Sequence, residues 1–402
     1  MSTGMSHYSW VLEREEIPAA HDVENGTRSA AFFMRRGDGD ARLRIGRKPE
    51  RGKAGMYPNS ATGGVTSRSP QRWSWLREHV RYRSGDVVVA TYPKCGTTLT
   101  EQVVLLLLNG GDASALDPLS KNSANYHGKF GKIWPSACIR PNEEVAAHDG
   151  SGPEEFVPRS LSWFEARPSP RVIKTHAPVP DLLGGNGSSE NESKLAAGAK
   201  YIVCTRNPLD ACVSYYYHAW NPFKSGWPFG AWVEAWCMGD AHNGCGSWFS
   251  WHRGWFDLLK KEPSSILWVH YESFLANPIS ETLRIAAFLG VSVSPSLIEK
   301  VVEESSFSKM KEAATTAAAK GARGNTPAHL RKGNRGGWRT HFASVHGGAE
   351  EAARLKTLVE KKFKTLLAGS GLQYDLGDGQ MLCASGACSS NNDNDDDADA
   401  AT

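Results

Sequence analysis

Residues 91–98 read Thr-Tyr-Pro-Lys-Cys-Gly-Thr-Thr and lie between two apolar runs, 87–90 and 103–108. This order predicts a strand, a tight loop and a helix. Such a loop aims backbone N–H groups and the positive end of a helix at one point, which favours an anion. Lys94 adds a full positive charge, and the two threonines add hydroxyl donors. The stretch predicts a site for a phosphate-like group; an ordinary strand-to-helix turn is the alternative.

The loop differs from the Walker A motif of nucleotide kinases. That motif requires Gly-x-x-x-x-Gly-Lys-Ser/Thr. Here Lys94 precedes Gly96, and no glycine opens the loop. Since no Walker B acid is evident either, a nucleotide kinase is disfavoured.

The composition suggests one folded domain between two less ordered ends. The chain has 402 residues and a formal net charge of +3. Residues 1–70 are rich in Gly, Arg and Ser and are expected to be flexible, and residues 371–402 are expected to form a disordered acidic tail. Residues 71–370 are left as the domain, which is basic and suits an anionic ligand. No run of basic and aromatic residues predicts a nucleic-acid partner.

The eight cysteines form no Cys-x-x-Cys pair and no zinc spacing, so no metal is expected and a reducing compartment is favoured. The N-terminus lacks the apolar segment of a secretory signal. The longest apolar run, 103–108, is far too short to span a bilayer. A cytoplasmic protein without a membrane partner is therefore expected, with an organelle transit peptide in the Arg-rich residues 27–53 as the alternative.

Short apolar segments alternate with helical patterns along the chain. The expected strands cover residues 87–92, 171–175, 201–205 and 266–271. The expected helices cover residues 97–109, 209–220, 279–289, 295–304 and 350–367, and residues 120–165 are expected to be irregular. This alternation predicts an α/β fold, a single domain with a central parallel sheet flanked by helices. Ligands of such sheets bind beyond the carboxyl ends of the strands.

Three further segments carry polar groups suited to that edge. Lys174 and His176 lie two positions apart, so on a strand they share one face and pair a cation with a candidate general base. Arg206 and Ser214 could hold one phosphate, although an ion pair between Arg206 and Asp210 is the simpler alternative. Residues 331–338, Arg-Lys-Gly-Asn-Arg-Gly-Gly-Trp, combine cations with glycines that allow close approach to a ligand. The alternatives are that His176 is an ordinary buried or edge histidine and that residues 331–338 form a solvated basic loop.

Taken together and in this order, these motifs resemble the cytosolic sulfotransferase family, which uses 3′-phosphoadenosine-5′-phosphosulfate (PAPS). The resemblance covers roughly residues 72–368 and implies a P-loop-like nucleotide-binding fold. The matching motifs are Tyr92 to Leu99, Lys174 to His176, Arg206 to Ser214, Arg331 to Gly336, Gly246 to Phe249, Tyr271-Glu272, Asn277-Pro278, and Ser306-Phe307 before Met310.

The resemblance also implies roles for individual residues. The implied catalytic group is His176 as general base, Lys94 at the bridging oxygen, Lys174 at the transferring sulfonate, and Ser214. The implied 5′-phosphate loop is Lys94, Cys95, Gly96, Thr97, Thr98 and Leu99. The implied 3′-phosphate group is Arg206, Ser214, Arg331, Lys332 and Gly333. Tyr271 and Ser305 would lie near the adenine, and Phe307 would stack on it.

Three departures from the family pattern stand out. Leu99 replaces a tryptophan, which removes an aromatic platform from one face of the adenine. Cys95 replaces a serine; a thiol at a helix N-terminus beside Lys94 could have a lowered pKa, and a packed, inert thiol is the alternative. Residues after Trp338 do not match the family's dimer motif, so that dimer is not predicted.

The predicted function is transfer of a sulfonate group from PAPS to a hydroxyl or amine of a small, partly apolar acceptor. Aromatic residues within 120–165 and 220–255, together with residues 313–330, are the expected acceptor side. A carbohydrate sulfotransferase is one alternative, although those enzymes are usually membrane-anchored. A non-catalytic nucleotide-binding or scaffold protein is the other.

Overall fold

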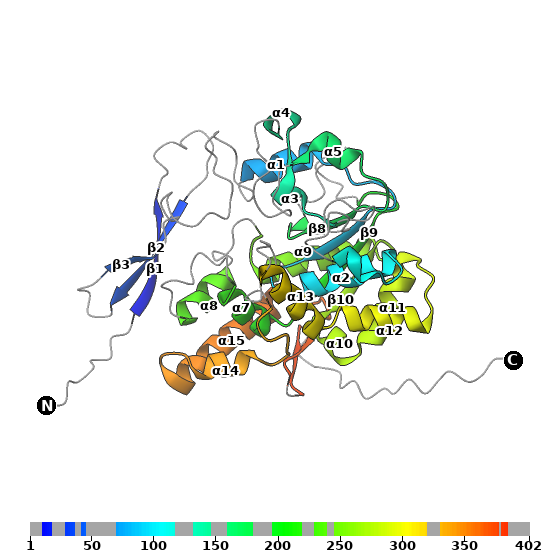
Figure 1. Cartoon of the computed structure of the whole chain (residues 1–402). Coiled ribbons are helices and arrows are strands. Elements are labelled where there is room, and N and C mark those ends of the chain that lie inside the picture. Colours follow the sequence, from blue (N-terminus) through cyan, green and yellow to red (C-terminus); the bar gives the residue numbers. More distant parts are fainter. Residues whose placement is uncertain are drawn as a thin grey trace.

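The computed structural model describes residues 10–17, 29–36, 42–45, 70–116, 132–145, 159–179, 195–218, 229–238, 245–319, 330–377 and 379–384. At its centre lies a parallel five-stranded sheet (Figure 1). In spatial order its strands are β10 (Ile266–His270), β9 (Lys200–Thr205), β4 (Val87–Thr91), β8 (Val172–Thr175) and β5 (Lys132–Ile133). The expected α/β architecture with a central parallel sheet is confirmed.

β4 lies in the middle of the sheet, and all five of its residues are buried. Its side chains alternate between two cores, because neighbouring residues of a strand point to opposite faces. Val87 and Val89 pack into one core, and Val88 and Ala90 pack into the other. A continuous apolar run is therefore what a strand covered on both faces requires.

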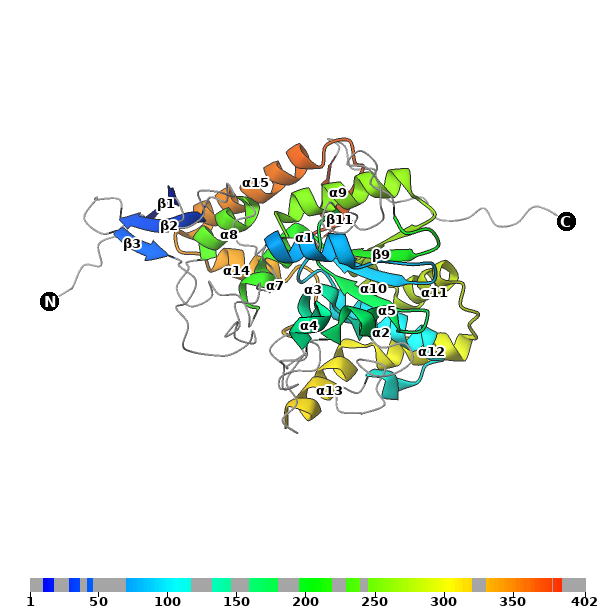
Figure 2. The same cartoon turned by 90° about the horizontal axis from the view of Figure 1, so that it is seen from above.

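Helices cover both faces of this sheet (Figure 2). The core around Val89 includes residues of α2 (Thr97–Leu108), α10 (Tyr271–Ala276), α11 (Pro278–Leu289) and α12 (Pro295–Glu304). The core around Val88 includes residues of α7 (Pro208–Tyr216), α8 (Phe229–Met238), α9 (Trp248–Lys261), α14 (Trp338–Ala343) and α15 (Gly348–Leu366). The helix expected over 209–220 thus ends at Tyr216, and Trp220 lies outside the described residues.

The tryptophan-rich segment lies in the core around Val88. Trp232, Trp236, Trp248 and Trp255 each have no exposed surface. These indole rings belong to α8 and α9 and serve packing.

The remaining elements surround the two layers. They are α1 (Pro70–His79), η1 (Ala113–Leu116), α3 (Pro135–Cys138), β6 (Ile139–Arg140), α4 (Asn142–Val145), β7 (Arg159–Ser160), α5 (Leu161–Glu165) and α13 (Phe307–Ala319). Residues 120–165 therefore contain short helices and strands where an irregular segment was expected. None of the described helices has the length and apolar character needed to cross a bilayer.

The N-terminal segment differs from the expectation. β1 (Trp10–Ile17), β2 (Ser29–Arg36) and β3 (Arg42–Ile45) form an antiparallel sheet in a part of the chain where no strand was expected. Apolar and aromatic residues at the centre of β2 favour a strand. The glycine and arginine content of the surrounding residues hides that local signal.

The C-terminal boundary differs as well. β11 (Gln373–Asp375) and β12 (Met381–Cys383) form an antiparallel hairpin, where a disordered tail from residue 371 was expected. Tyr374 and Leu382 are buried in the second core, which explains the order. Cys383 is disulfide-bonded, in contrast to the expected reduced state, and the six other described cysteines are buried free thiols. Residues 385–402 of the predicted tail lie outside the described part.

Candidate functional site

The loop between β4 and α2 adopts a conformation that suits an anion. Lys94 and Gly96 both have left-handed backbone torsions, with φ of 71° and 98°. Only glycine fits at position 96, because a Cβ there would lie 2.9 Å from the Sγ of Cys204 and 3.0 Å from the ring of Tyr271. α2 begins at Thr97, so the first N–H groups of the helix, including those of Thr97 and Thr98, have no intrahelical acceptor. The positive end of the helix lies at this loop.

Cys95 points away from this loop into the protein. Its side chain has no exposed surface and belongs to the core around Val88. Burial raises the pKa of its thiol far above the ordinary value, and the nearby thiol of Cys204 acts in the same direction. This contradicts the hypothesis of an activated thiol and agrees with the packed, inert alternative.

His176 lies directly after β8, and its ring is fixed by the end of β4. Its Nδ1 lies 2.7 Å from the carbonyl oxygen of Thr91 and 3.4 Å from the Oγ1 of the same residue. A carbonyl can only accept, so Nδ1 carries the proton and the neutral ring has its lone pair on Nε2. Thr91 Oγ1 in turn lies 2.6 Å from Thr97 Oγ1, which ties the histidine to the start of α2.

Lys174 shares one aromatic ring with His176. The Nζ of Lys174 lies 4.1 Å from the ring centre of Trp134, and the imidazole meets the same indole edge-on at 5.5 Å. Trp134 comes directly after β5, the neighbour of β8 in the sheet. A cation over an indole face is attracted by the ring quadrupole, so the indole holds the ammonium beside the imidazole.

Arg206 follows β9 and reaches across the loops. One guanidinium nitrogen donates to the carbonyl of Lys94 at 3.4 Å, and another donates to the carbonyl of Asn334 at 2.9 Å. The guanidinium also lies 4.6 Å from the ring centre of Tyr271. The ion pair with Asp210 that was the simpler alternative exists, at 4.0 Å, but it is one contact among several.

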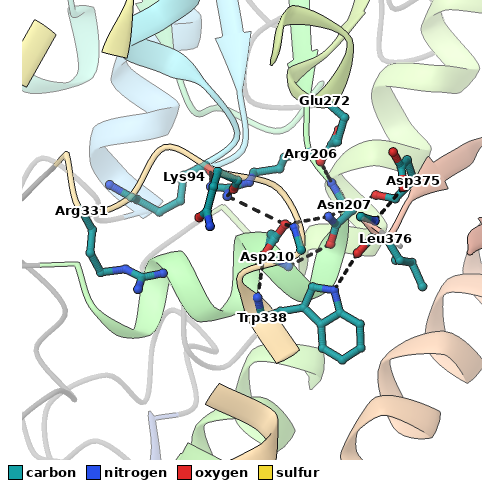
Figure 3. A network of polar contacts seen from close by, with 12 residues as sticks. Lys94, Arg206, Asn207, Asp210, Glu272, Arg331, Trp338, Asp375 and Leu376 are labelled. Atoms are coloured by element: carbon teal, nitrogen blue, oxygen red, sulfur yellow. Dashed lines mark hydrogen bonds and ion pairs between the residues drawn. The ribbon is translucent and has the colours of Figure 1, made fainter. Parts of the chain in front are cut away.

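Asp210, in the first turn of α7, fixes the glycine-rich loop. Its Oδ2 accepts from the Gly336 N–H at 2.7 Å, and its Oδ1 accepts from the Trp338 N–H at 2.9 Å. Asn207 caps the same helix by accepting from the N–H of Asp210 (Figure 3). A buried carboxylate that receives several N–H bonds holds its donors firmly.

The loop at 331–333 meets Phe307 at the start of α13. A Cβ on Gly333 would collide with the Phe307 ring, so the backbone lies directly against it. The guanidinium of Arg331 lies 5.1 Å from the ring centre of Tyr217 and 3.1 Å from the Nε2 of His341. Lys332 is exposed. The structure therefore brings Arg206, Phe307 and this loop together, as expected.

The remaining expected residues surround this cluster with differing contacts. Tyr271 begins α10 beside Arg206, and Ser214 is partly buried on α7. Ser305 is buried, and its hydroxyl donates to the carbonyl of Val301 at 2.7 Å, so it caps α12. Leu99 packs partly buried against the core around Val89.

The lowered pKa of Lys94 reflects its burial and the positive charges that surround it. Burial, followed by the positive charges of Arg206, Lys174 and Arg331, lowers this pKa to about 7. Three cationic side chains from three other segments are thus close enough to Lys94 to repel its charge. Such a concentration of positive charge favours a multiply charged anion. Among the described residues no group of His, Cys, Asp or Glu could hold a metal ion.

The sequence did not single out two residues that shape this site, Asn207 and Asp375. Asp210 entered as an ion-pair partner and within the 206–214 motif, and Trp134 entered only as one of the aromatic residues of the expected acceptor side. Asn207 could have been found, because an asparagine before a proline-led helix is a capping signal. The contacts of Trp134 and Asp375 depend on tertiary structure, and no local pattern marks them.

Glu272 beneath Arg206 is a buried carboxyl whose pKa burial raises to about 7. Its Oε1 accepts from the N–H of Asn207 at 2.8 Å, while its Oε2 is buried without a hydrogen-bond partner. Because the folded state holds this proton more tightly, stability is lost as pH rises from the carboxyl's ordinary range through about 7. Glu272→Gln keeps the acceptor and removes the charge. We expect it to raise the melting temperature by a few degrees above about pH 7 and to change little near about pH 5.

The matched control for this prediction is the exposed Glu303→Gln, which should leave the thermal denaturation curve unchanged at both pH values. If Glu272→Gln lowered the melting temperature equally at every pH, this would contradict a raised pKa of Glu272.

Comparisons with a family model and with known proteins all point to the same protein family. Residues 84–364 match the family model described as sulfotransferase domain. Sulfotransferase 1A1 of Rattus norvegicus is 29% identical over 286 residues, which cover 69% of this chain and 86% of that protein. Sulfotransferase 1B1 of Mus musculus is 30% identical over 246 residues, which cover 60% and 70%.

Solved structures give the same fold. Retinol dehydratase in complex with androsterone and the inactive cofactor PAP superposes with a TM-score of 0.54 at 22% identity, covering 76% of this chain and 88% of that chain. The complex of retinol dehydratase with retinol and PAP superposes with a TM-score of 0.54 at 19% identity, covering 90% and 99%. Mouse sulfotransferase SULT7A1 complexed with PAP has a TM-score of 0.50 at 20% identity, covering 75% and 92%.

Proposed function

This chain belongs to the sulfotransferase family, and from that premise we propose that it transfers a sulfonate group from PAPS to a hydroxyl or amine of a small, partly apolar acceptor. One observation carries the proposal. An imidazole whose Nε2 carries the lone pair lies at the carboxyl ends of three neighbouring strands, where Lys94 is also under the influence of three further cations. Transfer of an anionic sulfonate from a phosphate leaving group to a hydroxyl requires a positioned base for the hydroxyl proton and positive charge around the sulfonate and the phosphate.

The donor side fits a nucleotide with two separate phosphate groups. In the proposal the N–H groups of Gly96, Thr97 and Thr98 hold the 5′-phosphate at the start of α2. Arg206 and residues 331–333 hold the 3′-phosphate, with Ser214 nearby. Gly333 supports this, because its missing side chain lets the backbone lie against Phe307 and leaves the loop close to the ring expected to stack on adenine.

The chemistry needs one proton acceptor and one stabilised leaving group. His176 Nε2 takes the proton of the acceptor hydroxyl, whose oxygen forms the new bond to sulfur as the bond from sulfur to the 5′-phosphate oxygen breaks. Lys94 stabilises the negative charge that develops on that phosphate oxygen, and Lys174 neutralises a sulfonate oxygen. The hydrogen bond to Thr91 keeps Nε2 as the acceptor throughout.

The acceptor side is proposed to begin at Trp134. This ring is partly buried and touches both Lys174 and His176, so an apolar acceptor placed against it would bring its hydroxyl to the imidazole. The small apolar molecules bound by the structurally similar retinol dehydratase, androsterone and retinol, support this class. We further propose that the chain acts in the cytoplasm and does not form the family dimer whose motif it lacks.

The direct test is an acceptor screen with PAPS labelled in its sulfonate group, using phenols, steroid alcohols, amines and saccharides. We expect label to reach a phenol or an apolar alcohol in the wild type, and to be lost in His176→Ala. Transfer to saccharides alone would favour the carbohydrate alternative. PAP binding without transfer, in the wild type and in His176→Ala alike, would favour the non-catalytic alternative.

A further inference from the structure

The C-terminal hairpin, described for residues 372–377 and 379–384, lies beyond the sulfotransferase-domain match, which ends at residue 364. Its first strand is anchored to the sheet that carries the site. The Tyr374 hydroxyl lies 2.7 Å from the Oγ1 of Thr205, the last residue of β9, and the Tyr374 side chain is buried. The Asp375 carbonyl accepts from the Asn207 side chain at 3.4 Å. The hairpin is therefore fixed directly beside Arg206.

The same hairpin contacts the glycine-rich loop from the other side. Asp375 accepts from the Arg335 guanidinium at 3.0 Å. The Leu376 carbonyl accepts from the Trp338 indole N–H at 3.1 Å (Figure 3). Gly377 lies against Gly336 so closely that a Cβ on Gly377 would be 2.7 Å from the Cα of Gly336. Asp210 and the hairpin thus hold residues 335–338 between them.

We propose that this hairpin is a positioning element for the 331–337 loop and sets the affinity for the 3′-phosphate of the nucleotide; this rests on the proposed function. The loop needs such support. Gly333 and Gly336 both have left-handed torsions, and Lys332 and Arg335 are exposed. A segment with two glycines has many accessible backbone conformations, so it loses conformational entropy when it orders around a ligand. Contacts that order it beforehand reduce that cost and raise affinity.

Two glycines of the hairpin offer a matched test. Gly377 and Gly379 have left-handed torsions of 93° and 79°, so alanine strains the backbone at either position. They differ in surroundings, because a Cβ on Gly377 meets the backbone of the 331–337 loop, while a Cβ on Gly379 meets no atom within 4 Å. Gly377→Ala therefore acts as a wedge between hairpin and loop, and Gly379→Ala reproduces the strain without the wedge.

The readout is calorimetric binding of PAP compared with 5′-AMP, which lacks the 3′-phosphate. We expect Gly377→Ala to weaken PAP binding at least about tenfold and 5′-AMP binding less than about twofold. Gly379→Ala should leave both affinities within about twofold of the wild type. Melting temperatures of all variants show whether each is folded. Equal loss of both ligands in Gly377→Ala, or equal behaviour of the two alanine variants, would overturn the proposal.

A milder variant keeps the test decisive if the wedge prevents folding. Asp375→Asn removes the negative charge that faces Arg335. It keeps a side-chain oxygen that can still accept the hydrogen bond from the Gly377 N–H, which is 2.6 Å long in the wild type. We expect about a threefold to fivefold loss of PAP affinity with 5′-AMP binding unchanged, in line with one partly exposed ion pair. The control is Asp257→Asn, which breaks the 2.8 Å ion pair with Arg253 on α9. Unchanged PAP binding by Asp375→Asn would refute the positioning role of the hairpin and leave the proposed function standing. A wild type that does not bind PAP would refute the proposed function itself.

Discussion

Replacing His176 with alanine is expected to lower kcat for sulfonate transfer by about a hundredfold to ten-thousandfold, the usual contribution of a general base. The reason is that the His176 ring has one nitrogen left to accept a proton. Nδ1 is engaged with the Thr91 carbonyl, so Nε2 receives the proton. PAP affinity should stay within about twofold of the wild type, because the residues proposed to hold the phosphates lie on other segments. Steady-state kinetics with a labelled donor and calorimetry with PAP measure the two quantities.

The control for this prediction is His79→Ala, which removes an exposed histidine on α1 that stacks on Trp75. It should leave kcat unchanged. If His176→Ala kept most of the wild-type kcat, His176 would not be the general base, and the proposed nucleotide site would be unaffected by that result.

Lys94→Met is expected to lower kcat about a hundredfold to a thousandfold, comparable to the loss of one oxyanion donor. Methionine keeps an unbranched chain at this strained position and removes the charge. The same change should remove a pH dependence of PAP binding. The pKa of Lys94 is lowered to about 7 in the free protein, and the phosphates of a bound ligand raise it again.

The sign of this dependence follows from proton linkage. Below about pH 7 the ammonium is already present and binding needs no proton; above it, binding takes up a proton. The wild-type affinity for PAP should therefore fall up to about tenfold per pH unit between about pH 7 and pH 9, a range above the titration of the phosphates themselves. Calorimetry in two buffers of different ionisation enthalpy counts the proton taken up.

The matched control for Lys94→Met is Lys261→Met at the exposed end of α9, which should keep both kcat and the pH slope. A wild-type affinity that stays constant above pH 7, or a slope that persists in Lys94→Met, would show that Lys94 is not the titrating group.

The parts of this fold that the sequence predicts are those with strong local signals. β4 is a short run, apolar except for its last residue Thr91, before a loop that contains Gly96, and that combination is nearly sufficient for the strand, loop and helix. α12 begins at a proline preceded by a serine cap, so its limits could be read from the sequence. The convergence of Thr91, His176 and Arg206 followed from parallel strands having aligned carboxyl ends, and the pairing of β4 with β8 and β9 confirms it.

The parts that the sequence could not predict depend on contacts between distant segments. The short hairpin β11–β12 follows a glycine-rich stretch and precedes a run of aspartates, so its composition indicated disorder. Its order comes from burial of Tyr374 beneath β9, which no local pattern reveals. Cys95 is a similar case. Its sequence position suggested an activated thiol, but the loop turns its side chain into the core, where burial raises its pKa.

Titration of the full-length wild type with PAP, with 5′-AMP as the comparison ligand, tests the central claim most directly. The claim is that four separate segments form one cationic crevice for a nucleotide with two phosphate groups. We predict stoichiometric PAP binding at about pH 7, at least about tenfold tighter than binding of 5′-AMP. No detectable heat with PAP, or equal affinity for both nucleotides, would contradict the account.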